Sequence, residues 1–395
     1  MNRDFTRGPV TQVMLLFALP MILGNLLQQF YNVADTLIVG QFLGAAALAA
    51  VGSSYTLMTF LPSILLGMCM GSGAVFSIRF GQRDERGLKE AVFASFVLVA
   101  AVTAVLNALA CAGTNLIIRF LQVPAGVRGL MREYLVVIFC GIAATFLYNY
   151  FASLLRAVGN SVAPLAFLAV SAVLNIVLDL LFVIRFHQGV AGVAVATLMA
   201  QGLSAVISFT ILLKRLKTYE VTEAFHFYDM TMMVNMMRVA IPSTLQQSIV
   251  HIGMLLVQSV VNVFGSAVMA GFAAGTRIES ICIVPMLAIG NAMSTFTAQN
   301  IGAGRPDRVK QGYRYCYAMV GFFAVVICII MQLWGDLFIR GFLNEGSAET
   351  ASQTVMAYVR FISFFFVFMG ITSSTAGLLR GAGGVVVFTL ATHVN

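Results

Sequence analysis

The chain has 395 residues, of which 60% are hydrophobic and 10% are charged. An ordinary soluble domain carries about 25% charged residues, so these few charges do not suffice for the surface of a soluble protein. Disorder is excluded as well, because 32 Phe and 21 Met cannot all remain in water. The excess of 23 Lys and Arg over 15 Asp and Glu is typical of basic cytoplasmic loops, and we expect no nucleic-acid partner.

Long apolar segments follow one another along the whole chain. A helix needs about 20 predominantly apolar residues to cross the hydrocarbon core of a bilayer. Such segments lie approximately at 11–38, 45–78, 91–118, 131–155, 162–184, 190–213, 238–264, 267–300, 313–339, 352–378 and 384–395. The last is too short to span. None alternates with the period of two that a barrel strand needs, so we predict an all-α integral membrane protein.

The first half of the chain recurs in the second. Four landmarks return in the same order at a nearly constant offset: Leu19-Pro20 as Ile241-Pro242, Pro62 as Pro285, the loop from Gly81 as the loop from Gly302, and Leu154-Leu155-Arg156 as Leu378-Leu379-Arg380. Chance similarity between apolar helices explains one such match better than four. Six spans per copy start both copies on the same side, which predicts two parallel six-helix repeats, an arrangement typical of secondary transporters.

The repeat also divides the chain and measures its length. We predict a first lobe over 1–213, a cytoplasmic linker over 214–237 and a second lobe over 238–395. The last two spans of the first lobe project onto residues beyond 385, where the chain soon stops. We therefore expect a C-terminally truncated form of a protein of about 440 residues, with ten or eleven of its twelve helices.

The distribution of basic residues predicts the orientation. Sixteen Lys and Arg fall in connections on the side of the N-terminus and of the linker, and this count includes Arg156 and Arg380. Five fall on the opposite side, and Arg277 and Arg360 lie within spans. Because basic loops stay in the cytoplasm, we expect a cytoplasmic N-terminus.

Two carboxyl groups within spans are the strongest candidates for function. Asp35 shares a helical face with Tyr31 at i−4 and Gln28 at i−7, and Asp179 has Asn175 at i−4. A charge inside the bilayer is costly and is therefore a functional hypothesis. Such a carboxyl can exchange a proton for a cation, as an H⁺-coupled carrier requires. The alternative is a structural carboxyl whose hydrogen bonds are satisfied.

The third acid within a span favours a structural interpretation. Glu279 and Arg277 do not share a helical face, so we expect Glu279 to pair with Arg360 or His251. Arg277, Glu279 and Arg360 are then buried charges that brace the second lobe. His251 alone on an apolar face is more often a hydrogen-bonded core residue than a proton relay.

The remaining polar and proline candidates lie in spans one and seven. Gln246 and Gln247 either line a cavity or join helices through hydrogen bonds. Pro20 and Pro242 each remove a backbone hydrogen bond, so both are hinge candidates, with a static kink as the alternative. The six cysteines show no metal-ligand spacing and no phosphate loop is present, so we expect neither a metal centre nor a cofactor.

These residues resemble the multidrug and toxic compound extrusion (MATE) family over essentially the whole chain. The resemblance is carried by FALPMILGNLLQQFYNVADTLIVG in span one, by TRIESICIVPMLAIGNAMSTFTAQNIGAGRPD in span eight, and by LLRAVGN and LLRGAGG after spans four and ten. It implies twelve helices in two lobes that form a V. It also implies a transporter of the bacterial cytoplasmic membrane that exports organic cations in exchange for H⁺ or Na⁺, and we expect a monomer.

The resemblance assigns roles to single residues. Asp35 matches the first-helix aspartate of the family, and Asn175 with Asp179 match the Asn-x-x-x-Asp of helix five in its proton-coupled branch. Asn149 and Thr197 fall where that branch places polar partners of the site. The sodium-coupled branch has acids in helices seven and ten, which this chain lacks. H⁺ is therefore the expected ion, and Na⁺ at Asp35 and Asp179 stays open.

Two other functions are weaker interpretations of the sequence. A flippase for a lipid-linked saccharide is expected to line its cavity with several Arg or Lys, whereas Arg277 and Arg360 are the only such candidates in spans. A membrane enzyme needs a catalytic constellation, and the four histidines are too scattered to supply one. We therefore expect a transporter and not an enzyme.

Overall fold

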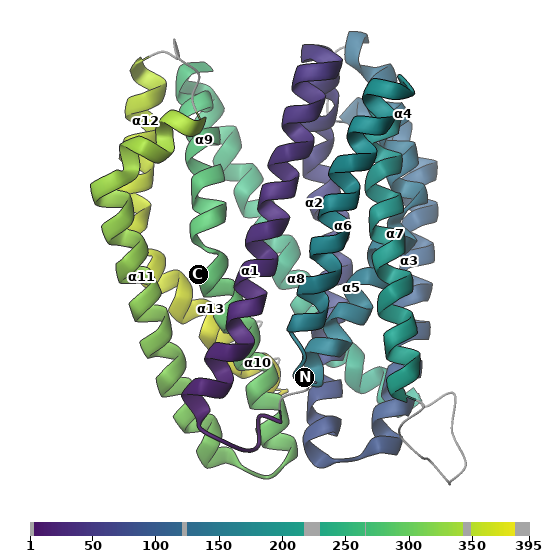
Figure 1. The fold of residues 1–395 in the computed structure, drawn as a ribbon, viewed down its shortest axis with the longest axis vertical. Helices are drawn as coiled ribbons and strands as arrows, with labels where there is room; N and C mark the ends of the chain where they lie inside the picture. The colour runs from purple at the N-terminus through teal and green to yellow at the C-terminus, as the bar shows by residue number, and fades with distance from the viewer. Residues whose placement is uncertain (1–3, 121–124, 217–229, 265, 343–348, 384–395) are drawn as a thin grey trace.

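The computed structural model describes residues 4–120, 125–216, 230–264, 266–342 and 349–383, and these ranges contain helices and no strand (Figure 1). The first half comprises α1 (Val10–Ile38), a π-helical turn η1 (Val39–Leu43), α2 (Gly44–Gln82), α3 (Glu85–Phe120), α4 (Ala125–Cys140), α5 (Ile142–Ala157), α6 (Val162–Leu180), a second π-helical turn η2 (Leu181–Arg185) and α7 (Gly189–Leu216). The second half comprises α8 (Met230–Val261), a 3₁₀ turn η3 (Asn262–Phe264), α9 (Ser266–Cys282), α10 (Val284–Gly302), α11 (Pro306–Phe342), α12 (Glu349–Ser363) and α13 (Phe366–Gly381).

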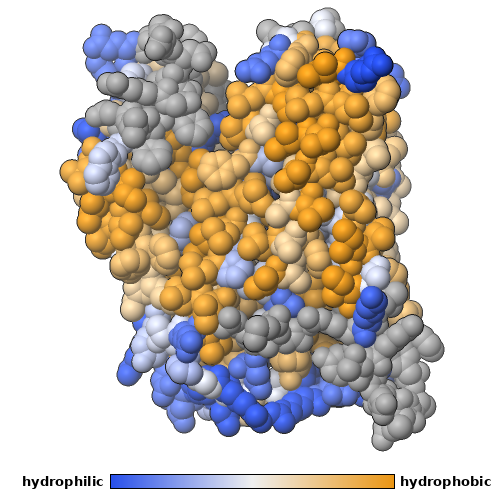
Figure 2. Space-filling view, viewed as in Figure 1, coloured by the Kyte–Doolittle hydropathy of each residue, from blue (hydrophilic) through white to orange (hydrophobic). Residues whose placement is uncertain are grey.

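The helices form a multi-pass membrane protein. Within the described ranges, seven helical segments are long and apolar enough to cross a bilayer, and the bent pairs α4–α5 and α12–α13 raise this number to nine. Figure 2 shows an apolar band across the middle of the face in view, with hydrophilic residues at both ends. Each of the ten predicted spans before residue 384 coincides with one helix or with two consecutive helices. The short eleventh segment and most of the predicted linker lie outside the described residues.

The sharp bends recur at matching places in the two halves. The axis turns by 46° between α4 and α5, at Gly141, and by 52° between α12 and α13, next to Phe365. The offset from Gly141 to Phe365 equals that from Arg156 to Arg380, so the bends follow the sequence repeat. Helices α1 and α8, by contrast, continue through Pro20 and Pro242 without a break. A hinge at the prolines therefore stays a prediction about motion.

The two halves touch through closely packed helices. Helix α2 lies against α8 and α10, and α1 contacts both α6 and α10. A Cβ atom built on Gly67 would lie 2.6 Å from the backbone nitrogen of Thr244, and one on Gly71 would lie 2.6 Å from the Cα of Ala240. Small residues four apart let two helix backbones approach where lipid supplies little driving force for association. The interface between the halves is thus formed by backbone contact along α2 and α8.

The first helix of each half begins in the apolar core of the other half. Val10, Met14 and Ala18 of α1 belong to the buried cluster that α9 to α13 build. In α8, Met232, Met236 and Ala240 belong to the buried cluster of α2 to α5. The offset between these two triplets equals that between Pro20 and Pro242, so they are equivalent in the repeat. Each core is completed by a helix from the other half.

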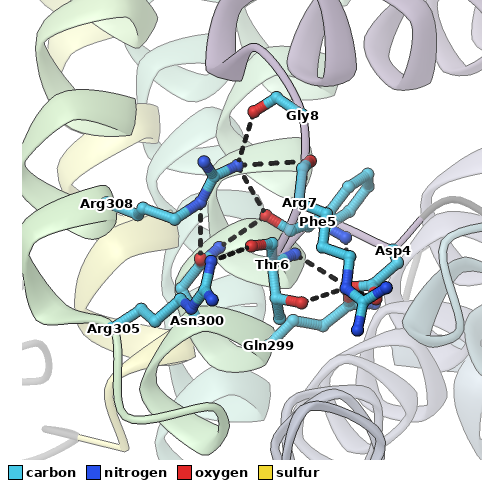
Figure 3. A network of polar contacts seen from close by, with 9 residues as sticks. All are labelled: Asp4, Phe5, Thr6, Arg7, Gly8, Gln299, Asn300, Arg305 and Arg308. Atoms are coloured by element: carbon cyan, nitrogen blue, oxygen red, sulfur yellow. Dashed lines mark hydrogen bonds and ion pairs between the residues drawn. The ribbon is translucent and has the colours of Figure 1, made fainter.

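The end of the molecule that carries residues 4–8, the α2–α3 turn and the α10–α11 turn is called the basic end below (Figure 1). A polar network fastens the N-terminal segment there (Figure 3). Arg308 donates to the carbonyl oxygens of Phe5 at 3.1 Å, Arg7 at 3.3 Å and Gly8 at 3.1 Å, and Arg305 donates to that of Thr6 at 2.7 Å. The network joins the start of the first half to the α10–α11 turn of the second.

Gln299 extends this network to the end of α5. Its Oε1 accepts the Phe5 N–H at 3.1 Å, and its Nε2 donates to the carbonyl oxygen of Ala157 at 2.7 Å. The side chain is 0% exposed. One buried amide from the second half thus binds two separate segments of the first half.

Candidate transport site

The structure brings the two predicted carboxyl groups together in the first half. Asp35 lies on α1 and Asp179 on the adjacent α6, and their carboxyl groups are close enough to interact electrostatically. Asp179 is 0% exposed and Asp35 is half-buried. Each acid is followed within a few residues by a π-helical turn, and the two turns, η1 and η2, contact each other. Such turns are rare in helices and are frequent at functional sites.

The oxygens of this acid pair lack protein donors. Asp35 Oδ1, both carboxylate oxygens of Asp179 and Asn175 Oδ1 are buried and accept no hydrogen bond from the described residues. The amide nitrogen of Asn175 donates to Thr197 Oγ1 at 3.4 Å, so Thr197 holds this amide while the amide oxygen stays unsatisfied. Buried acceptors without donors cost free energy, and a proton or a small cation would satisfy them. The arrangement can therefore hold H⁺ or Na⁺.

Polar side chains from four helices surround the pair. Tyr31 lies close to Gln28 and to Gln201 of α7, and Thr145 of α5 donates to Gln201 Oε1 at 2.5 Å. Tyr134 of α4, 4% exposed, interacts electrostatically with both acids. Tyr134, Thr145 and Gln201 were not among the residues predicted for the site. Gln201 could have been predicted from the sequence, because it is an amide side chain inside an apolar span, as Gln28 is.

A second feature is a cavity of about 240 Å³ between the two halves. It is lined by residues of α1, α2, α5 and α6 from the first half and of α8, α10 and α13 from the second. Four of the predicted residues line it: Pro20, Gln28, Asn149 and Gln247. The other predicted polar residues, Tyr31, Asn175, Thr197, Gln246 and His251, are absent from its described lining.

Two arginines of this cavity were predicted to lie in connections, and that prediction was wrong. Arg156 lies in the last turn of α5 and Arg380 in the last turn of α13, and both line the cavity. The error arises because these helices continue beyond the apolar run and end only near the glycine that follows each arginine. The expectation that only Arg277 and Arg360 lie within spans was therefore also wrong.

The predicted buried charge cluster of the second half is wrong in part. Glu279 is half-buried and accepts a hydrogen bond from the hydroxyl of Tyr358 on α12. Arg277 and Arg360 are exposed. In α9 the neighbouring Ile278 is buried, and in α12 Val359 is buried, so each arginine lies about a quarter of a turn away from the packed face of its helix.

Comparisons with known proteins agree with this architecture. The MatE family model matches residues 20–181 and again 242–394, so the two matched segments start at the equivalent prolines of the repeat. The chain is 32% identical over 384 residues to a probable multidrug resistance protein of Bacillus subtilis, covering 97% of this chain and 85% of that protein. A second B. subtilis protein described in the same words is 27% identical over 388 residues, covering 96% and 83%.

Among solved structures, a crystal structure of MATE in complex with MaL6 superposes with a TM-score of 0.92 at 23% identity. The match covers 98% of this chain and 87% of that chain, and it shows that the fold is shared. The family model covers most of the residues, and the acid pair and most of the cavity lining lie within the matched segments. The chain is therefore a transporter, not an enzyme, and it belongs to the MatE family.

Proposed function

We propose that the chain exports small organic cations across the bacterial cytoplasmic membrane in exchange for H⁺. The observation that carries this proposal is the contact between Asp35 and Asp179, with buried oxygens that accept no hydrogen bond from the described residues. The relatives described as probable multidrug resistance proteins support the export of drugs. They do not favour the flippase, and a drug exporter is the better interpretation of the same fold.

The acid pair suggests how a proton drives the cycle. Two adjacent carboxyl groups in a medium of low dielectric constant do not both stay ionised, so the pair keeps one proton and carries one negative charge, and uptake of a second proton makes it neutral. The ionised pair attracts an organic cation, and protonation removes the attraction. A proton that enters from outside releases the cation outward, and proton release inside restores the site. Each cycle moves the two charges in opposite directions.

The basic end is the cytoplasmic end in this proposal. It carries Arg79, Arg83, Arg305 and Arg308, together with residues 4–8. Loops rich in Lys and Arg remain in the cytoplasm. We further infer that one chain suffices for transport, because the acid pair and the cavity are each built within a single chain.

Transport of ethidium into everted vesicles tests the proposal. We expect Asp35→Asn and Asp179→Asn each to abolish uptake driven by a pH gradient, because an amide cannot bind and release the proton. Asp307→Asn is the matched control, since Asp307 is an exposed carboxyl at the basic end. Proton-driven uptake retained in both site variants would refute the assignment. A requirement for Na⁺, with no proton movement, would replace H⁺ by Na⁺ at the same residues.

A further inference from the structure

The cavity between the halves has a charge opposite to that of the acid pair. Arg156 and Arg380 are the charged residues among its described lining, and no carboxylate lines it there. The neighbouring polar groups are neutral, and they include Asn25, Asn149 and Asn291. Asp35 and Asp179 lie elsewhere in the first half. The molecule thus contains two separate polar sites of opposite charge.

The two arginines occupy equivalent places in the repeat. Each lies in the last turn of the second part of a bent span, and they reach the cavity from opposite halves. A basic residue near a helix C-terminus interacts favourably with the helix dipole, which explains a cation at each place. It does not explain why both cations face one cavity without a carboxylate.

The two guanidinium groups differ in their contacts with the protein. Arg380 is 7% exposed, and its Nη1 donates to Asn291 Oδ1 at 3.2 Å, so Asn291 holds this guanidinium in the wall of the cavity. Arg156 is half-buried and has no hydrogen bond or ion pair with the residues that the structure describes. Removal of a cation from water is costly unless an anion or hydrogen-bond acceptors compensate. Guanidinium groups bind carboxylate and phosphate through paired N–H donors.

We propose that Arg156 and Arg380 bind the carboxylate or phosphate group of an organic molecule in the cavity between the halves. Because the arginines belong to different halves, the oxyanion contacts both when they are close and loses one when they separate. The inference is independent of the proposed function, since it requires neither Asp35 nor Asp179. It adds organic oxyanions, including zwitterions, to the molecules that this chain recognises.

Equilibrium binding of radiolabelled phenyl phosphate to the purified full chain in detergent tests the inference. We expect Arg156→Gln and Arg380→Gln each to weaken binding by about tenfold or more, because a charge-assisted contact is lost. Arg314→Gln is the matched control, since Arg314 is exposed on α11 and is not among the residues that line the cavity. Unlabelled benzoate is expected to displace the probe, and benzylamine is not. Equal displacement by benzylamine, or unchanged affinity in both cavity variants, would overturn the inference.

A second variant distinguishes loss of binding from loss of folding, which the arginine substitutions alone do not. Asn291→Asp keeps the shape of the side chain and adds a carboxylate next to Arg380, so phenyl phosphate binding should be lost. The elution profile in size-exclusion chromatography should stay that of the parent chain. Retained affinity in this variant would also overturn the inference. Displacement of the probe by phosphatidylglycerol would identify a lipid headgroup as the source of the oxyanion. Displacement by soluble oxyanions, with no displacement by the lipid, would identify a soluble substrate. Asp35→Asn should leave binding unchanged, which separates this test from that of proton coupling.

Discussion

At the scale of single residues, the site depends on amides and hydroxyls as much as on acids. Gln201 accepts a hydrogen bond from Thr145 and contacts Tyr31, which in turn lies next to Asp35. Gln28 contacts Tyr31 and also lines the cavity between the halves. A continuous polar path therefore joins the acid pair to the cavity through neutral side chains. Its members carry no charge, so they do not neutralise the acids.

Gln201→Leu tests this supporting role. The substitution keeps the size of the side chain but leaves the hydroxyl of Thr145 without its acceptor, and a buried polar group left unsatisfied costs about 1–3 kcal/mol. We expect a lower melting temperature in detergent than for Gln311→Leu, an exposed glutamine on α11. Equal melting temperatures of the two variants would contradict the supporting role.

Some of these residues can be predicted from the sequence and others cannot, for physical reasons. Asp35 and Asp179 stand out because a carboxyl in an apolar span is costly and rarely serves packing alone. Gln201 and Thr145 do not, because a neutral polar side chain in a membrane helix often only joins two helices. Arg156 and Arg380 were misplaced because a helix that ends one turn beyond its apolar run cannot be distinguished from a loop by composition.

At the scale of helices, α2 and α8 pack closely at positions where a glycine replaces a side chain. Lengths of the spans were predictable because the bilayer thickness sets them. The bend at Gly141 could not be predicted from the sequence, because a glycine inside a helix also permits close packing against a neighbouring helix. A Cβ on Gly141 would clash with the side chain of Leu198 on α7. The sequence alone does not distinguish a glycine at which a helix bends from a glycine that allows another helix to pack closely.

A pair of alanine substitutions tests the α2–α8 contact. Gly71→Ala places a methyl group 2.6 Å from the Cα of Ala240, whereas Gly202→Ala on α7 has no atom within 4 Å. Alanine is favoured over glycine in a helix by about 1 kcal/mol, so Gly202→Ala should be neutral or stabilising. We expect Gly71→Ala to lower both the melting temperature and the rate of transport. If both variants behave alike, the backbone contact is not what limits this interface.

At the scale of the whole molecule, the basic end holds the two halves together. The N-terminal segment, the end of α5 and the α10–α11 turn meet around Gln299 and Arg308 (Figure 3). These contacts must be released if the basic end opens during the transport cycle. The division of the chain at 213 and 238 into two lobes stays a prediction. The cores show in addition that α1 completes the core of the second half and that α8 completes the core of the first half.

Gln299→Ala combined with Arg308→Ala should favour a state that is open at the basic end. Spin labels at the exposed positions Gln82 and Lys310, in a cysteine-free chain, report the separation of the halves. We expect a shift of the distance distribution to longer values, because the double variant removes the hydrogen bonds to Phe5, Ala157, Arg7 and Gly8. The exposed Arg314→Ala is the control. An unchanged distribution would show that backbone packing alone closes this end.

The exchange of first helices between the cores constrains how the halves can move. Ala18 and Ala240 are the last members of the triplets that α1 and α8 bury in the opposite core, and Pro20 and Pro242 follow two residues later. Each proline removes one backbone hydrogen bond close to the point where its helix leaves the opposite core. We therefore predict that a rotation of the two halves relative to each other bends α1 and α8 together near Pro20 and Pro242.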